Sequence, residues 1–288
     1  MKKVFIYIGL IGICMSGCIT SQKKGELFDK ENLVAWCIVP FDAEERSPEQ
    51  RAVMLGELGI SALAYDYRDS HIPSFPEEIE VLKAHDICLQ AVWLWADPRQ
   101  EDVMGEAGRI LFDMLEASDT QTEVWVGMPE DAFEGLSGEE SLALAVSSLR
   151  EILVEAEKIG CTLALYNHGG WYGEPGNLVR IIEELGNKEV RIVYNFHHGH
   201  EHLDRFPEYL DLMLPYLSTI NLNGMRAEGP KIITLGNGDR ELEMMRAIQA
   251  SAFSGSIGII GHTDGEDIRP VLERNLQGLE KLKYQLRN

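Results

Sequence analysis

Short apolar runs recur along the chain after residue 30, and each is followed by a polar loop and a stretch with apolar residues at helical spacing. The runs are nearly continuous in hydrophobic residues, as expected of strands covered on both faces. We predict strands in eight segments: 32–41, 60–68, 87–96, 122–129, 161–170, 190–196, 218–225 and 255–263.

The segments between these runs have the punctuation of helices. Ser47 is a predicted N-cap, Pro48 suits the first turn and Gly59 is a stop signal. Further helices are predicted in segments 137–160, 176–186, 204–217, 240–252 and 269–286. A strand followed by a helix, repeated eight times, predicts an α/β fold, a parallel eight-stranded (β/α)8 TIM barrel. An open doubly wound sheet is the alternative, but no GxGxxG motif follows the first strand.

The first residues have the pattern of a secretory signal rather than of the fold. MKK is a basic start, VFIYIGLIGICM is apolar, and MSGC resembles the lipobox of bacterial lipoproteins, which implies lipidation of Cys18. The apolar run is shorter than the ~20 residues of a spanning helix. We therefore expect a signal peptide at 1–17, a tether at 18–30 and one barrel domain at 31–288. The expected location is the periplasm, with membrane contact only through the lipid anchor.

Composition narrows the class of partner. The chain has 288 residues, 45% of them hydrophobic, which is enough for a large core. Its formal net charge of −21 argues against nucleic acid as a partner, because such binding relies on a basic face.

The histidines are concentrated where a barrel keeps its chemistry. Active sites of TIM barrels lie at the carboxyl ends of the strands. Six of the eight histidines follow the fifth, sixth or eighth predicted strand: His168, His197, His198, His200, His202 and His262. Imidazole titrates near neutral pH, so this pattern favours proton transfer or metal binding.

Alternation along the strands indicates which side chains point inward. His168 shares a face with Ala164 and Tyr166, and His262 shares one with Gly258 and Ile260. The same alternation places Asp66 with Arg68 on the second strand and Asn221 with Asn223 on the seventh.

Three strand ends carry a family resemblance. The segments LALYNHGGW, VYNFHHGH and GHTDGED resemble those of the xylose isomerase-like barrel superfamily, often labelled sugar phosphate isomerase/epimerase, over nearly all of 31–288. The exported, lipid-tethered subset is most similar, and it is associated with oxidised (3-keto) glycosides. The resemblance implies a carbohydrate substrate and chemistry beside a carbonyl group.

The resemblance also implies one divalent metal bound by Glu, Asp, His and Glu, but the chain departs from that set. Tyr166 and Asn195 stand at two carboxylate positions, the last Glu falls near Gly261 and His262, and His198 matches the family His. Two readings stay open. Either histidines rebuild a site for Zn, Mn, Co or Ni, with Asp264 or Glu266 adding a carboxylate, or the imidazoles act directly as acid and base. The metal candidates are His168, His198, His200 and His262.

The remaining candidates have roles that suit a sugar site. Asp66 and Lys231 join His168, His198 and His262 as catalytic candidates. The substrate-binding candidates are Trp171, which could stack on a sugar ring, and Asn195, Asn221, Asn223, Arg68 and Tyr166.

We expect an isomerase or epimerase, or a 3-keto-glycoside lyase or hydrolase, that abstracts a proton next to a carbonyl. The alternative is a non-catalytic sugar-binding lipoprotein without the family metal. An export signal and the lack of a Gly-rich phosphate loop favour an unphosphorylated substrate.

Overall fold

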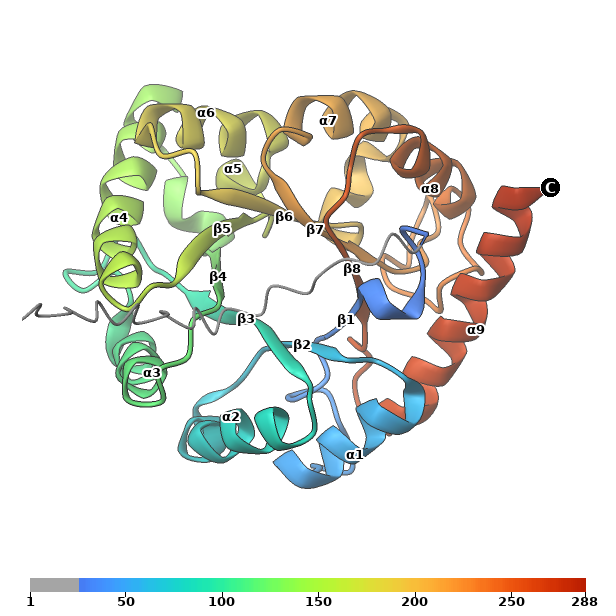
Figure 1. Cartoon of the computed structure of the whole chain (residues 1–288). Helices are drawn as coiled ribbons and strands as arrows, with labels where there is room; N and C mark the ends of the chain where they lie inside the picture. Colours follow the sequence, from blue (N-terminus) through green and yellow to red (C-terminus); the bar gives the residue numbers. More distant parts are fainter. Residues whose placement is uncertain (1–25) are drawn as a thin grey trace, which may run out of the picture.

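The computed structural model of the chain describes residues 26–288. The predicted signal peptide and Cys18 lie outside these residues. Eight parallel strands form a closed barrel in chain order, in which β8 pairs with β1 (Figure 1). The strands are β1 Leu33–Trp36, β2 Ala62–Tyr65, β3 Cys88–Trp95, β4 Glu123–Gly127, β5 Thr162–Tyr166, β6 Arg191–Asn195, β7 Leu217–Leu222 and β8 Ser256–Ile260. The prediction of a (β/α)8 TIM barrel is confirmed.

Helices surround the barrel and cover its outer face (Figure 1). They are α1 Pro48–Leu58, α2 Phe75–Ala84, α3 Gly105–Ala117, α4 Gly138–Lys158, α5 Gly170–Gly173, α6 Pro175–Leu185, α7 Phe206–Met213, α8 Glu241–Ala250 and α9 Ile268–Arg287. Short 3-10 helices span Lys30–Asn32, Asp69–Ser74, Glu130–Phe133 and His197–Arg205. Within residues 26–288, no helix combines the length and apolar character needed to cross a membrane.

The start and end signals of α1 act as the sequence predicts. The Ser47 hydroxyl accepts a hydrogen bond from the Gln50 amide, and the Gln50 side chain accepts one from the Ser47 amide. This capping box satisfies two backbone donors that the helix leaves open. Gly59 ends the helix with φ of +74°, a conformation that glycine adopts without steric cost.

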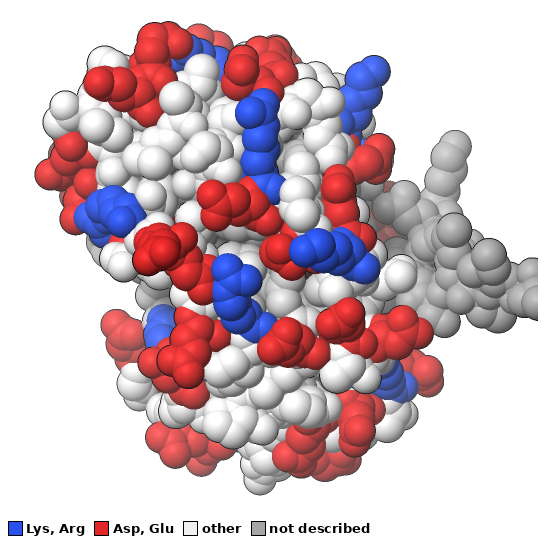
Figure 2. Space-filling model, turned by 90° about the vertical axis from the view of Figure 1, so that its left-hand side faces the viewer, with Lys and Arg blue, Asp and Glu red and all other residues white. Residues whose placement is uncertain are grey.

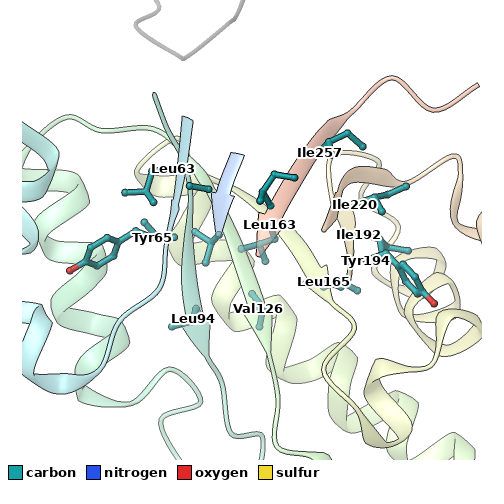
Figure 3. Close-up of a cluster of buried hydrophobic side chains, with 14 of the residues drawn as sticks. Leu63, Tyr65, Leu94, Val126, Leu163, Leu165, Ile192, Tyr194, Ile220 and Ile257 are labelled. Atoms are coloured by element: carbon teal, nitrogen blue, oxygen red, sulfur yellow. The ribbon is translucent and has the colours of Figure 1, made fainter. Parts of the chain in front are cut away.

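The outer layer of the core lies between strands and helices. Outward-facing side chains such as Leu63, Val126 and Ile192 form a continuous apolar layer there (Figure 3). These residues alternate with the inward-facing residues of the same strands, so each strand is buried on both faces.

The barrel interior is filled by aromatic rings. Trp36, Trp93, Trp125 and Tyr166, called here the aromatic plug, pack among small residues of neighbouring strands. The ring centroids of Trp36 and Trp125 are 4.9 Å apart, and those of Trp93 and Tyr166 are 4.5 Å apart. Gly127 makes room for this packing, because a Cβ at that position would lie 2.2 Å from the Trp93 ring. The interior is therefore a packed core rather than a pore.

The outer surface is acidic. Figure 2 shows Asp and Glu side chains spread over one flank of the molecule, with Lys and Arg side chains lying singly among them. This flank of the described chain presents a negative surface to solvent, in keeping with the net charge of −21.

The fifth strand is shorter than the sequence predicts. The prediction extended it to Gly170, but β5 ends at Tyr166 and the short helix α5 begins at Gly170. Gly169 and Gly170 have φ values of +40° and +60°, and a Cβ on Gly170 would lie 2.3 Å from the Glu130 carbonyl oxygen. Two glycines thus turn the chain sharply away from the strand direction.

Candidate active site

A cavity of about 540 Å³ lies at the carboxyl ends of the strands. Trp36, Trp93 and Tyr166 of the aromatic plug line it. His168, His197, His198 and His262 line it, together with Asp66. The site therefore lies at the rim where TIM barrels keep their catalytic groups.

Four imidazole rings form a continuous arc in this cavity, called here the histidine arc. His168 and His198 have ring centroids 4.6 Å apart, His198 and His197 are 4.0 Å apart, and His197 and His262 are 5.9 Å apart. Three separate strand ends supply these rings, after β5, β6 and β8. His168 and His262, which strand alternation places inward, line one cavity together with His198.

Buried asparagine amides hold the strand ends that carry the arc. The Asn167 side chain accepts a hydrogen bond from the Asn195 amide and donates one to the Asn195 carbonyl. Asn221 donates to the Asn195 side-chain oxygen at 2.9 Å, and the Asn223 side chain accepts from the His197 amide. Asn195, Asn221 and Asn223 therefore tie β5, β6 and β7 together rather than line the cavity.

Burial keeps the arc uncharged. Desolvation, together with smaller effects of the neighbouring His262 and His168, lowers the pKa of His197 to about 3. Burial also lowers the pKa of His198 far below its ordinary value, as do His197 and His168 beside it. The pKa values of His168 and His262 are lowered by burial too. All four rings are therefore neutral near pH 7.

Two ring nitrogens of the arc have no partner within the described chain. The Nδ1 atoms of His168 and His197 are buried and form no hydrogen bond. A buried polar atom without a partner costs free energy unless a ligand or water satisfies it.

Asp66 directly follows β2 and lines the same cavity as the histidine arc. The side chain is 3% exposed, and its Oδ1 accepts a long hydrogen bond of 3.4 Å from the Val39 amide. Desolvation raises its pKa to about 7, against smaller opposing effects that include Arg68. With this pKa, the Asp66 carboxyl group can gain or lose a proton near neutral pH, as an acid-base catalyst does.

Sequence analysis missed several lining residues. Cys37 has an unusual φ of +56° and a buried thiol whose pKa is raised well above its ordinary value by burial. Trp36 donates from Nε1 to the Tyr166 hydroxyl at 3.0 Å, which fixes that group at the cavity floor. Residues 97–108, the loop after β3 together with the first turn of α3, form a large part of the wall. Positive φ at a non-glycine residue and the course of a loop leave no clear signal in a single sequence.

Several predicted site residues lie elsewhere. His200 is held by a hydrogen bond of 2.6 Å to the Arg226 carbonyl, and His202 pairs with Glu174 at 2.9 Å. Trp171 packs on Phe133 at 5.1 Å between centroids, because the Gly169–Gly170 turn carries it away from the rim. Lys231 is exposed and lies 3.6 Å from Glu201. His200, Trp171 and Lys231 are predicted site residues and His202 is not; none of the four lines the cavity.

Arg68 and Tyr166 do line the cavity. The guanidinium of Arg68 lies 5.4 Å from the centre of the Phe41 ring and donates to the Tyr67 carbonyl. Phe41 in turn stacks on His262 at 3.9 Å between centroids. These two predicted residues are therefore placed where they could contact a substrate.

The residues at the rim do not fit the divalent metal site that the family resemblance implies. Within residues 26–288, no group of three or more His, Cys, Asp or Glu side chains is arranged to hold a metal ion. Tyr166 and Asn195 stand at the two carboxylate positions. The Tyr166 hydroxyl accepts a hydrogen bond from the Trp36 ring, and the Asn195 side-chain oxygen accepts one from the Asn221 side chain. Asp264 and Glu266, suggested as added carboxylates, do not line the cavity.

The fold and the strand-end cavity define a TIM barrel with a site at its carboxyl rim. Residues 87–282 match the family model described as xylose isomerase-like TIM barrel, and the chain belongs to that family. The family resemblance of the strand-end segments is thereby confirmed. No curated protein matches the chain.

Solved structures share the fold at low sequence identity. A 3-keto-D-glucoside 4-epimerase, YcjR, from E. coli is 15% identical with a TM-score of 0.68, covering 87% of this chain and 99% of that one. A D-psicose 3-epimerase from Clostridium cellulolyticum H10, solved with D-tagatose, is 15% identical with a TM-score of 0.63, covering 88% and 99%. The IOLI protein, solved with a bound zinc atom, is 12% identical with a TM-score of 0.66, covering 88% and 97%.

Proposed function

We propose that this chain is a carbohydrate-active enzyme that removes a proton from a carbon next to a sugar carbonyl. The outcome is isomerisation or epimerisation, or cleavage of a 3-keto glycoside. The observation that carries the proposal is that the neutral histidine arc and the buried Asp66 carboxyl group line the same cavity. Aromatic side chains line it as well. The sugar epimerases among its structural neighbours support the substrate class.

His168 is the proposed base. Its ring is neutral and lines the cavity, and Trp95 lies edge-on to it at 4.9 Å between centroids. The imidazole accepts the proton, and the electron pair of the broken C–H bond moves onto the carbonyl oxygen to form an enolate. His198 is neutral, and its ring centroid lies 4.6 Å from that of His168. In this proposal its N–H group donates a hydrogen bond to the enolate oxygen.

Asp66 is the proposed acid. With a pKa raised to about 7 by burial, it carries a proton over much of the neutral range. In epimerisation it returns a proton to the carbon from the opposite side as the enolate collapses. In elimination the enolate electrons form a C=C bond and break the bond to the glycosidic oxygen, which takes the Asp66 proton. Either course leaves His168 protonated and Asp66 ionised, and exchange with water restores both.

The charges around the cavity favour an unphosphorylated sugar. Among the described residues that line it, Arg68 is the only Lys or Arg. Its NH1 already donates to the Tyr67 carbonyl, and its planar face lies over Phe41. A phosphate group normally meets several cations or a helix N-terminus dedicated to it.

Proton exchange with solvent tests this function directly. The protein is incubated in D2O with methyl 3-ketoglucoside, and deuterium at the carbons beside the carbonyl is followed by NMR together with any cleavage product. We expect exchange that His168→Ala slows by roughly 100-fold, and epimerisation or cleavage that Asp66→Asn slows by a similar factor. His85→Ala is the matched control, because His85 pairs with Glu49 away from the cavity.

The rival function is a sugar-binding protein without catalysis, which the loss of the family carboxylates at Tyr166 and Asn195 favours. Saturable sugar binding without exchange or cleavage, for methyl 3-ketoglucoside and for free ketoses, would establish that rival. Exchange that both variants retain in full would contradict the assigned residues.

We also propose that the chain is exported and anchored through a lipid on Cys18. The basic start, the apolar run and the MSGC segment support this proposal. Metabolic labelling with a fatty acid in a bacterial host should mark the wild-type chain and not Cys18→Ser. Equal labelling of the two chains would contradict the anchor.

A further inference from the structure

One continuous segment forms an extension of the cavity away from the histidine arc. Residues 97–108 contribute Val103, Met104 and Ala107 to the wall, next to Trp95 at the end of β3. We call this part the β3–α3 arm. It belongs to the same cavity as the arc, because Trp95 contacts His168 at 4.9 Å between centroids.

The cavity is too large for one sugar ring. A hexose displaces about six water molecules, or roughly 180 Å³ at ~30 Å³ per water. The cavity measures about 540 Å³. A sugar placed against the histidine arc therefore leaves the arm free for a second group.

The arm is built in advance of any ligand. Within the loop, the Asp97 amide donates to the Val103 carbonyl at 3.0 Å and the Gly105 amide donates to the Asp102 carbonyl at 3.1 Å. The Arg99 side chain donates hydrogen bonds to both carboxylate oxygens of Asp97, and the Arg109 side chain donates to both of Asp102. A loop fixed by its own hydrogen bonds loses little conformational entropy when a ligand binds.

Apolar side chains make up much of the arm, and Gln100 and Glu106, which also line the cavity, are exposed to solvent. Val103 and Met104 are buried, Ala107 is partly buried, and Trp95 leaves 41% of its surface exposed. The two aspartates of the loop already bond to Arg99 and Arg109, so their oxygens are occupied by intraprotein partners. A second sugar would bring several hydroxyl groups that need partners, whereas an apolar group is satisfied by contact alone.

We propose that the β3–α3 arm binds an apolar aglycone, an aryl or alkyl group joined to the sugar by its glycosidic bond. The substrate class is thus glycosides of phenols or apolar alcohols, in preference to free sugars and disaccharides. This assignment rests on the proposed function in one respect, which is that the sugar ring occupies the histidine arc.

Binding by calorimetry tests the assignment apart from catalysis. The probes are methyl and phenyl 3-ketoglucosides, each as α and β anomers, and the 3-keto form of a glucose disaccharide. We expect at least one phenyl anomer to bind roughly 10-fold or more tightly than its methyl counterpart and than the disaccharide, because the ring buries apolar area in the arm. Equal affinity of methyl and phenyl probes, or tighter binding of the disaccharide, would overturn the proposal.

Two variants locate the effect in the arm. Ala107→Phe fills it, so the phenyl advantage should disappear while methyl binding persists; Ala117→Phe, at an exposed position of the same helix, is the matched control. Met104→Ala enlarges the arm, so preference should shift from phenyl to naphthyl glycosides. A phenyl advantage unchanged in both variants would refute the location.

The two proposals fail separately. A phenyl preference in binding without proton exchange on any probe would refute the proposed catalysis and leave the arm assigned. Proton exchange on methyl and phenyl probes alike, with equal affinity, would refute the arm and leave the catalysis.

Discussion

Replacing Asp66 by Asn should stabilise the folded protein while it removes activity. Burial raises the pKa of Asp66 from the ordinary 3.8 to about 7. Between these two pH values the folded chain binds a proton that the unfolded chain has released, so the free energy of unfolding falls as pH rises. The difference is about 3 pKa units, and at 1.36 kcal/mol each the ionised group destabilises the fold by roughly 4 kcal/mol above pH 7.

Asn keeps the shape of the side chain and cannot ionise, so Asp66→Asn should gain between about 1 and 4 kcal/mol at pH 8 and little at pH 4. The lower end allows for hydrogen bonds that the amide group leaves unmade. Urea unfolding followed by circular dichroism, at several pH values, measures the effect. Asp211→Asn, at an exposed position of α7, is the matched control and should change neither stability nor its pH dependence.

The prediction is wrong if Asp66→Asn is no more stable than wild type at pH 8. It is also wrong if the stability of the variant declines between pH 4 and 7 as steeply as that of wild type. Such a result would mean that the Asp66 carboxylate is solvated or paired in the folded protein. A gain in stability that accompanies loss of epimerisation or cleavage is the pattern expected where a catalytic group is held in an unfavourable setting.

Three further predictions concern the site and the barrel. The pH profile of kcat/KM should fall above about pH 7 as Asp66 loses its proton, and should fall on the acid side only below pH 6.5, because the pKa of His168 is lowered. Prolonged dialysis against a chelator should leave activity unchanged, measured with metal analysis of the same sample; loss that one added divalent metal restores would contradict the poor fit of the rim to a metal. Gly258→Ala should destabilise the protein by about 1–3 kcal/mol in thermal unfolding, because the new Cβ would lie 1.6 Å from the Asn221 side-chain oxygen. Gly56→Ala, with nothing within 4 Å of the new Cβ, should instead be neutral or stabilising by up to about 1 kcal/mol.

The barrel could be predicted from the sequence because its strands and helices follow from patterns of neighbouring residues. Each strand is a nearly continuous apolar run, and the signals at Ser47 and Gly59 fix α1 within a residue. Alternation within strands also placed His168 and His262 in the cavity, since the period of two persists just past the last strand residue. What followed from strand geometry was therefore predictable from the sequence.

The rest of the site depends on loops, which have no such period. The segment after β6 forms a 3-10 helix, so it turns His197 and His198 into the cavity and His200 away, although all three stand within four residues. The Gly169–Gly170 turn removed Trp171 from the site. The arm formed by 97–108 is set by hydrogen bonds between loop residues, which no spacing of apolar positions reveals.

The aromatic plug decides how molecules reach and leave this centre. Because Trp36, Trp125 and Tyr166 fill the barrel from wall to wall, nothing passes through to its amino end. Substrate and product must therefore use the opening at the carboxyl ends of the strands, so bound product prevents the next substrate from binding until it dissociates. Inhibition by product should accordingly be competitive.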